Sequence, residues 1–334
     1  MIQNAKIFMR GKMLNSIFLI IAGFILLMGG AEYMVKGAVA IANRLHIPTI
    51  IIGLTIVAFG TSAPEFVVSI KSALNGSAGI SIGNIVGSNI ANILLVLGLT
   101  ALISPITCDK ETFIRDYKFL FISSALFIIF SLNNVFIFWH GIVFLLVLGY
   151  FVYHNYKNSS QEENSETSTE ENADSLPNKS WFFVTFITIA GLISIIYGAD
   201  VLINGAVKMA RLLGVSEEII GLTIIAVGTS LPELATTALA TIHHQTDVAI
   251  GNIVGSNIWN VIFIMGATAT ITEVPVPRQF LYYDMWVMAL ASILLYIIMV
   301  SKSRLTRIHG GVFLILYIIY VITQIMISKG VWTI

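Results

Sequence analysis

The sequence has few charged residues and a single cysteine. Only 11% of its 334 residues are charged, whereas a soluble domain carries roughly 25%. Cys108 has no second cysteine with which to form a disulfide. The formal net charge is zero, so no basic surface for a nucleic acid is expected. Hydrophobic residues make up 57% of the chain and the mean hydropathy is +0.89, which indicates an integral membrane protein.

Motifs of enzymes and of soft-metal sites are also missing. The chain has no GxSxG, no HExxH and no paired catalytic aspartate motif, so an intramembrane enzyme is disfavoured and we expect a transporter. Zinc, copper and iron prefer His or Cys ligands, and the six histidines are not placed for that role. The pair His243 and His244 is interpreted as a solvated turn. No cofactor is expected.

Long apolar stretches dominate the rest of the chain. A membrane-spanning helix needs about 20 apolar residues, and such stretches are too long and continuous for the strands of a barrel. The sequence therefore predicts an all-α membrane protein with ten transmembrane helices. They are expected near residues 16–42, 49–74, 79–104, 117–133, 135–155, 181–210, 218–242, 247–272, 282–301 and 308–328.

The chain contains the same segment twice. Residues 53–98 align without a gap to residues 221–266, at an offset of 221 − 53 = 168, and 21 of the 46 positions are identical. The identities are mainly Gly, Thr, Ser, Pro, Glu and Asn, which lipid-facing helices avoid. Doubled polar motifs inside apolar helices indicate a transporter built from two repeats.

A polar, acidic stretch at 156–180 separates the two halves. It has almost no apolar side chains, so it is predicted to be a disordered linker that serves as a tether. The regions 1–155 and 181–334 are predicted to be five-helix repeats. An odd number of spans in each half gives the halves opposite orientations, so the repeats are expected to have inverted topology.

Two glutamates lie in the middle of apolar segments, at repeat-equivalent positions. Placing an ionised carboxylate at the bilayer centre costs roughly 2.5–3.5 kcal/mol on insertion scales, so Glu65 and Glu233 need a reason to be there. Protonated glutamates that hydrogen-bond between helices are one interpretation. A cation site is the interpretation that we favour.

The neighbours of the glutamates are oxygen donors. Thr61 and Thr229 each precede a glutamate by four residues and share its helix face. Because proline has no N–H, Pro64 and Pro232 are expected to free the carbonyls of two residues, Gly60 and Gly228. Hydroxyls, carbonyls and carboxylates are hard ligands that suit calcium, which takes six to eight oxygens, and they also suit sodium.

The second doubled motif is GNIVGSN, at 83–89 and 251–257. With the asparagine three residues after it, it predicts a polar stripe at i, i+4 and i+8. Interhelical hydrogen bonding and lining of the ion site are both open for the first asparagine of each stripe, and the deeper positions are expected to line the site. The stripes are Asn84, Ser88 and Asn92 in one half and Asn252, Ser256 and Asn260 in the other.

The first predicted helix of each half also carries charged residues. Glu32 and Asp200 occupy equivalent positions near a helix end, where a structural or entrance role is favoured over ligation. Lys36 is expected to reach water or to pair with Glu32.

The pairing of GTSAPE and GTSLPE with GNIVGSN, over essentially the whole chain, resembles the two α-repeats of the calcium/cation antiporter superfamily. Within it, the chain is similar to prokaryotic sodium/calcium exchangers. The resemblance implies exchange of Ca²⁺ for Na⁺ by alternating access, with both ions bound as substrates. It also implies that the site is lined by Thr61, Ser62, Glu65, Ser88 and Asn92, with Thr229, Ser230, Glu233, Ser256 and Asn260.

The resemblance leaves alternatives. Some members have an aspartate at the position of Asn92 or Asn260, and its absence here argues against potassium cotransport. A proton/calcium exchanger shares this motif and remains an alternative. A passive cation channel is a third possibility, although channels usually build their pores from symmetric oligomers. We expect a multi-pass protein of the cell membrane, in contact with lipid, in which a monomer suffices for transport.

Overall fold

The structure, a computed structural model, is almost entirely helical. It describes residues 2–45, 47–162, 179–213, 226–328 and 331. Within these ranges, seven helices are long and apolar enough to cross a membrane, or up to eight if the bent pair Thr49–Thr61 and Ala63–Leu74 is one span. Large apolar side chains such as Phe18, Phe182 and Leu290 are exposed on the outside, as expected for contact with lipid rather than water.

The number of spanning helices differs from the ten that the sequence predicts for two reasons. Helix α7 (Lys110–Ser131) covers the expected segment 117–133, but its charged residues keep it below the composition of a typical span. The expected segment 218–242 begins outside the described residues and continues as α11 (Ala226–Gly228) and α12 (Leu231–Ile242). Residues 163–178, most of the expected linker, also lie outside the described ranges.

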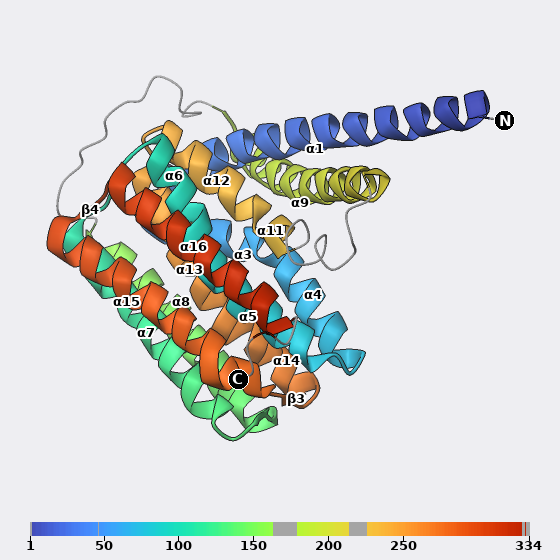
Figure 1. Ribbon diagram of the computed structural model, residues 1–334. Coiled ribbons are helices and arrows are strands. Elements are labelled where there is room, and N and C mark those ends of the chain that lie inside the picture. The colour runs from blue at the N-terminus through green and yellow to red at the C-terminus, as the bar shows by residue number, and fades with distance from the viewer. Residues whose placement is uncertain (1, 46, 163–178, 214–225, 329–330, 332–334) are drawn as a thin grey trace.

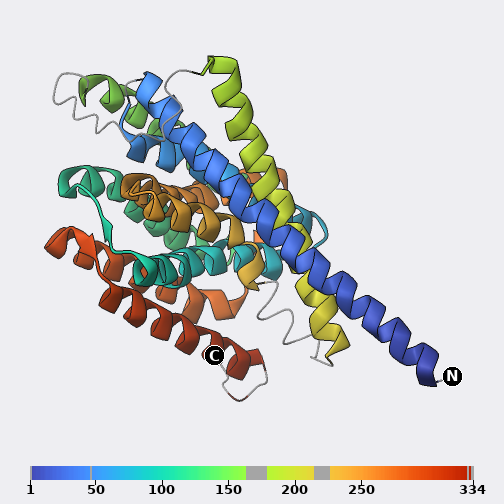
Figure 2. The same ribbon diagram turned by 90° about the horizontal axis from the view of Figure 1, so that it is seen from above.

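Two long helices, α1 (Ile2–Leu45) and α9 (Trp181–Leu212), run together along one side of the molecule (Figures 1 and 2). Glycines at repeat-equivalent positions of the two helices, 168 residues apart, line the contact between α1 and α9. A Cβ atom on Gly30 would lie 2.7 Å from the carbonyl oxygen of Gly191, and one on Gly198 would lie 2.9 Å from that of Gly23. Small residues let helices approach closely in lipid, so these glycines explain why α1 packs mainly on α9.

Two continuous helical runs occupy the interior of the bundle beside α1 and α9. One consists of α5 (Ala78–Ala91), η2 (Asn92–Val96) and α6 (Leu97–Ile103). The other consists of α13 (Thr246–Ile258), η4 (Trp259–Met265) and α14 (Gly266–Ile271). Both η segments are π-helical turns, which are frequent at functional sites. Ile85, Ile90, Ile253 and Ile258 are fully buried here.

Broken helices pack against these interior runs. The first consists of α2 (Thr49–Ile52), η1 (Gly53–Val57) and α3 (Ala58–Thr61), followed after a 46° bend by α4 (Ala63–Leu74). Within each half, α4 packs on α5 and α12 packs on α13, while α2 and η1 reach across to α13. The two repeats are therefore interleaved rather than separate.

Four outer helices complete the bundle: α7, α8 (Phe138–Glu162), α15 (Met285–Lys302) and α16 (Arg307–Ser328). α15 follows a π-helical turn, η5 (Phe280–Asp284). The α7 helix begins at Asp109, whose carboxylate accepts the backbone N–H of Thr112 at 2.8 Å, and this bond lowers the pKa of Asp109.

Short antiparallel strand pairs join the two halves at the ends of these helices. β1 (Ile106–Thr107) pairs with β4 (Arg304–Leu305), and β2 (Val135–Phe136) pairs with β3 (Val274–Pro275). Each pair therefore contains one strand from each half of the chain.

Candidate ion-binding site

The two doubled glutamates each begin a helix after a break. Ser62 (φ −82°, ψ 5°) precedes α4, and Ser230 (φ −87°, ψ 4°) precedes α12 in almost the same conformation. A proline in the first turn fits both helix starts, because its missing N–H would have no partner there. The side chains of Glu65 and Glu233 are 1% and 0% exposed.

Hydroxyl groups of the first repeat reach polar groups of the second. Ser62 Oγ donates to Glu233 Oε1 at 3.3 Å. Thr61 Oγ1 donates to Asn252 Oδ1 at 3.2 Å and lies 3.4 Å from Ser256 Oγ. The break between α3 and α4 therefore lies directly against α12 and α13, and the predicted ligands of the two halves share one buried region.

Four asparagines link the two interior runs, from η2 to α13 and from η4 to α5. Asn92 Nδ2 donates to Asn257 Oδ1, and Asn260 Nδ2 donates to Asn89 Oδ1, both at 3.0 Å. All four side chains are buried. Each of these bonds crosses between the repeats, so they fix the two asparagines that follow the GNIVGSN motifs relative to one another.

Many oxygens of the predicted ligands have no hydrogen-bond partner among the described residues. The buried oxygens without one include six atoms from this set: Glu65 Oε1, Glu65 Oε2, Glu233 Oε2, Asn92 Oδ1, Asn260 Oδ1 and Ser230 Oγ. A buried polar group without a partner costs about 1–3 kcal/mol, and a cation is a partner that satisfies several oxygens at once. Calcium takes six to eight oxygen ligands, and carboxylate, amide and hydroxyl oxygens are of the kind that it binds.

The charge of this region is limited to two carboxylates. Among the described residues, no group of three or more His, Cys, Asp or Glu side chains could hold a metal ion. The remaining ligands would be neutral hydroxyls and amides. Such a set differs from the carboxylate-rich sites of calcium buffers and suits an ion that must also leave.

The remaining predicted ligands differ in how deeply they are buried. Ser88 and Ser256 are buried, and Thr229 is partly exposed at the start of the break before α12. Gly228 is buried. The expectation that Pro64 leaves the carbonyl of Gly60 free is wrong in part, because a backbone N–H at the end of α3 donates to it. The tightened last turn supplies this donor, and a carbonyl retains a second lone pair.

The first asparagine of each stripe hydrogen-bonds between helices, which was one of its two open interpretations. Asn84 Nδ2 donates to Ser69 Oγ at 2.8 Å and to the Glu65 carbonyl at 3.0 Å. Asn252 Nδ2 donates to Thr237 Oγ1 at 2.9 Å. Ser69 and Thr237 are repeat-equivalent partners that the sequence analysis missed, although their 168-residue spacing was a usable signal.

Glu32 lies outside this region and is tied to a different element. Its Oε1 pairs with Lys36 Nζ at 2.9 Å, and its Oε2 lies 2.6 Å from His243 Nε2. The pairing with Lys36 agrees with the sequence interpretation, but the turn at His243 is not merely solvated. The equivalent Asp200 is exposed and accepts a bond from Asn204 on its own helix, so the part of the chain that the structure describes shows this contact with another element for Glu32 and not for Asp200.

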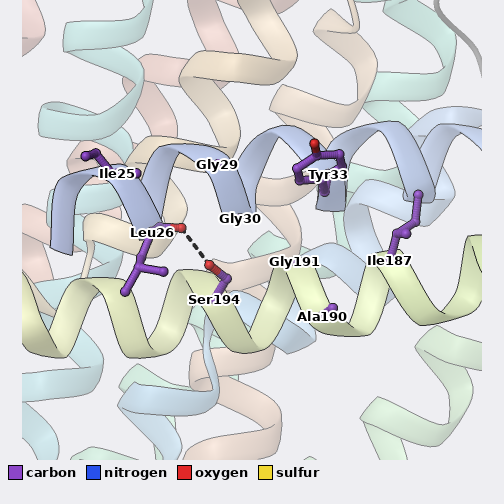
Figure 3. Close-up of a pocket in the computed structure, with 9 residues that line it drawn as sticks. All are labelled: Ile25, Leu26, Gly29, Gly30, Tyr33, Ile187, Ala190, Gly191 and Ser194. Atoms are coloured by element: carbon purple, nitrogen blue, oxygen red, sulfur yellow. Dashed lines mark hydrogen bonds between the residues drawn. The ribbon is translucent and has the colours of Figure 1, made fainter. Parts of the chain in front are cut away.

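A cavity of about 320 Å³ lies between α1 and α9, away from the two glutamates (Figure 3). Its walls are mainly apolar side chains and glycines, with the hydroxyls of Tyr33 and Ser194, and Ser194 Oγ donates to the carbonyl of Leu26 at 2.8 Å. Because no carboxylate lines the cavity and its walls are mainly apolar, it lacks the chemistry of an ion site.

Comparisons with known proteins agree with one another. The family model described as "Sodium/calcium exchanger protein" matches residues 15–157 and 183–326. The chain is 36% identical over 313 residues to the putative antiporter CaxA of Alkalimonas amylolytica, covering 92% of this chain and 98% of the relative. It is 30% identical over 338 residues to the sodium/calcium exchanger MaX1 of Methanosarcina acetivorans, covering 91% and 97%.

A solved structure has the same fold. The sodium-calcium exchanger NCX_Mj, soaked with Na⁺ and Ca²⁺, superposes with a TM-score of 0.76 at 33% sequence identity. The superposition covers 91% of this chain and 96% of that one. The likeness therefore extends over the full membrane domain rather than over one repeat.

Proposed function

This chain belongs to the sodium/calcium exchanger protein family and is a calcium/cation antiporter rather than an enzyme, and we propose that the ion it exchanges for Ca²⁺ is Na⁺. The observation that carries this proposal is that buried oxygens of Glu65, Glu233 and other predicted ligands have no hydrogen-bond partner among the described residues. Hard oxygens without a soft ligand suit both Ca²⁺ and Na⁺. The names of the relatives support sodium as the second ion.

We assign the ion ligands to both repeats. The two glutamates supply the charge, and the hydroxyls, amides and two carbonyls supply neutral oxygens. Ser62 and Thr61, whose hydroxyls now reach Glu233, Asn252 and Ser256, would turn their lone pairs toward a bound ion. The proposed set is Glu65, Glu233, Thr61, Thr229, Ser62, Ser230, Ser88, Ser256, Asn92 and Asn260, with the carbonyls of Gly60 and Gly228.

The charge of the pair couples the two ions. Two ionised glutamates give the site a charge of −2, which one Ca²⁺ or two Na⁺ neutralise. Without a cation, two like charges would remain in a region of low dielectric, where their repulsion is strong. The unloaded protein would therefore pass poorly through an occluded state, and it would cross between the two faces of the membrane only when loaded.

The architecture supports alternating access. We propose ten transmembrane helices in two inverted five-helix repeats, 1–155 and 181–334, joined by the tether 156–180. Inverted repeats around a shared site let one set of helices rearrange against the other while the site stays near the midplane. We further propose that the chain acts in the cell membrane and that a monomer suffices for transport, without a cofactor.

A proton/calcium exchanger is the second candidate, because protons bind the same carboxylates. Purified protein in liposomes distinguishes the two. We expect calcium uptake to be driven by an outward sodium gradient and only weakly by an outward proton gradient of equal size. Uptake that follows the proton gradient alone would contradict the sodium proposal.

The same liposomes test the passive channel. An antiporter must release sodium as calcium enters, so calcium uptake and sodium efflux should rise and fall together. Glu65→Gln and Glu233→Gln should nearly abolish both fluxes while the protein stays folded. Calcium entry without any counterflow would indicate a channel.

A further inference from the structure

A third buried carboxylate lies outside the ion-binding region. Asp284 is 0% exposed and ends the π-helical turn η5, where the chain enters α15. Its Oδ1 accepts the hydroxyl of Tyr320 at 3.1 Å and the side-chain amide of Gln324, both from α16. Its Oδ2 has no hydrogen-bond partner among the described residues. A fully buried carboxylate with one bare oxygen requires something to offset its charge.

The first repeat has a carboxylate at the equivalent position, since 284 − 168 = 116. Asp116 is also buried, at 2% exposure. There the neighbouring Arg115 cancels the charge, with Nε 3.0 Å from Asp116 Oδ1 and the other end of the guanidinium 3.4 Å from Oδ2. In the second repeat the residue before the aspartate is Tyr283. The repeats therefore share the carboxylate but not the cation.

No other described element supplies a cation to Asp284. α5 and η2, which pack on α15, have no ionisable side chain. α7 approaches through Ser131, whose hydroxyl lies 3.1 Å from the sulfur of Met285. The titratable group that contacts Asp284 is Tyr320 on α16. The rings of Tyr283 and Tyr317 lie 6.4 Å and 6.5 Å from that of Tyr320.

The side chains that contact Asp284 also do not offer the oxygen ligands that a metal ion would need. Tyr320 and Gln324 both donate hydrogen bonds to Asp284. The amide oxygen of Gln324 is already used, because it accepts the side-chain amide of Gln279 at 2.7 Å. A proton needs no such ligand set, because it is held by a single covalent bond to one carboxylate oxygen.

We propose that Asp284 is a proton-binding site that is separate from Glu65 and Glu233 and that stays occupied, on Oδ2, at neutral pH. The proton comes from solvent and forms an O–H bond, which leaves the side chain neutral. Oδ1 remains the acceptor for Tyr320 and Gln324. The first repeat thus neutralises its aspartate with Arg115, and the second repeat neutralises its aspartate with a proton.

Infrared spectroscopy detects this proton without a transport assay. The variant Glu65→Gln/Glu233→Gln removes the carboxyls of the ion site and serves as the background, so the result does not depend on the proposed function. At pH 7 we expect a protonated carboxylic acid band that Asp284→Asn abolishes. An unchanged spectrum would overturn the proposal. Loss of the band when sodium is added at constant pH would also overturn it, because the site would then bind a metal cation.

A matched pair of substitutions in the otherwise unaltered protein tests the same point by stability. Asparagine resembles a neutral aspartic acid. Asp284→Asn should therefore keep calcium uptake within about twofold of the wild type and the unfolding temperature within a few degrees of it. Asp116→Asn removes the charge that pairs with Arg115 and should lower the unfolding temperature clearly. An Asp284→Asn protein that fails to fold, or that is as unstable as Asp116→Asn, would contradict a protonated Asp284.

Discussion

Asn89 and Asn257, which are 168 residues apart, bind each other's backbone across the centre of the molecule. Asn89 Nδ2 donates to the Asn257 carbonyl at 3.1 Å, and Asn257 Nδ2 donates to the Asn89 carbonyl at 3.3 Å. Their own side-chain oxygens accept the amides of Asn260 and Asn92. This reciprocal pair holds the two interior runs in register and leaves Oδ1 of Asn92 and Asn260 without a described partner.

Asn257→Ala should therefore damage the ion site indirectly. It removes the donor to Asn89 and leaves the Asn92 amide without its acceptor, and each buried group left unpaired costs about 1–3 kcal/mol. We expect a lower unfolding temperature and calcium affinity weakened by about tenfold or more, as measured by thermal unfolding and calorimetry. Asn75→Ala, at an exposed helix end, is the control. Wild-type affinity in Asn257→Ala would contradict a positioning role.

Two adjacent glycines of α1 should respond differently to alanine. A Cβ atom on Gly30 would lie 2.7–2.8 Å from backbone atoms of α9, whereas one on Gly29 meets nothing within 4 Å. Gly30→Ala should destabilise the protein by about 1–3 kcal/mol through overpacking. Gly29→Ala should be neutral or slightly stabilising, because alanine favours a helix by about 0.5–1 kcal/mol. Equal unfolding temperatures for the two variants would rule out a tight α1–α9 contact.

The contact between Glu32 in α1 and His243 in the turn after α12 should affect stability more than ion binding. His243→Asn introduces the residue found at the equivalent position 75 and removes the contact with Glu32. Because both side chains are about a third exposed (33% and 28%), we expect a loss of at most about 1 kcal/mol, reduced further by salt. Calcium affinity should stay unchanged, with Asp200→Asn as the control. A tenfold change in affinity would place His243 in the ion pathway.

Calcium binding should weaken as the pH falls. Only ionised glutamates attract the cation, so protons and calcium compete for the oxygens of Glu65 and Glu233, and at most two protons are displaced for each Ca²⁺. We expect the apparent midpoint of the pH dependence to move lower as calcium is raised. Calorimetric titrations at constant sodium and several pH values measure this. An affinity that is flat from pH 8 to pH 5 would show that these carboxylates are not ligands.

Local features of the chain could be predicted from the sequence because they depend on short-range chemistry. The helical membrane character follows from composition, and the family follows from the doubled motifs. The breaks at Ser62 and Ser230 follow from the glycine, hydroxyl and proline pattern around each glutamate. The ten-helix count and the ligand set stay predictions.

Contacts between distant elements could not be predicted. Asn89 lies one position beyond Ser88, so helical periodicity places it off the polar stripe, and only the position of Asn257 reveals its role. The contact between Glu32 and His243 joins residues 211 positions apart. Asp284 falls among apolar residues with no motif around it, and its partners come from a different helix. The repeat offset relates Asn89 to Asn257 without indicating that the two touch, and it does not lead to the partners of Glu32 or Asp284.

The central claim is that Glu65 and Glu233 form one site that Ca²⁺ and Na⁺ share. The most direct test is calorimetric titration of calcium into the purified protein at increasing sodium, at constant pH and ionic strength. The account predicts that the apparent affinity for calcium falls steadily as sodium rises, and that calcium binding is lost in Glu65→Gln and in Glu233→Gln. A calcium affinity that sodium leaves unchanged would contradict the shared site.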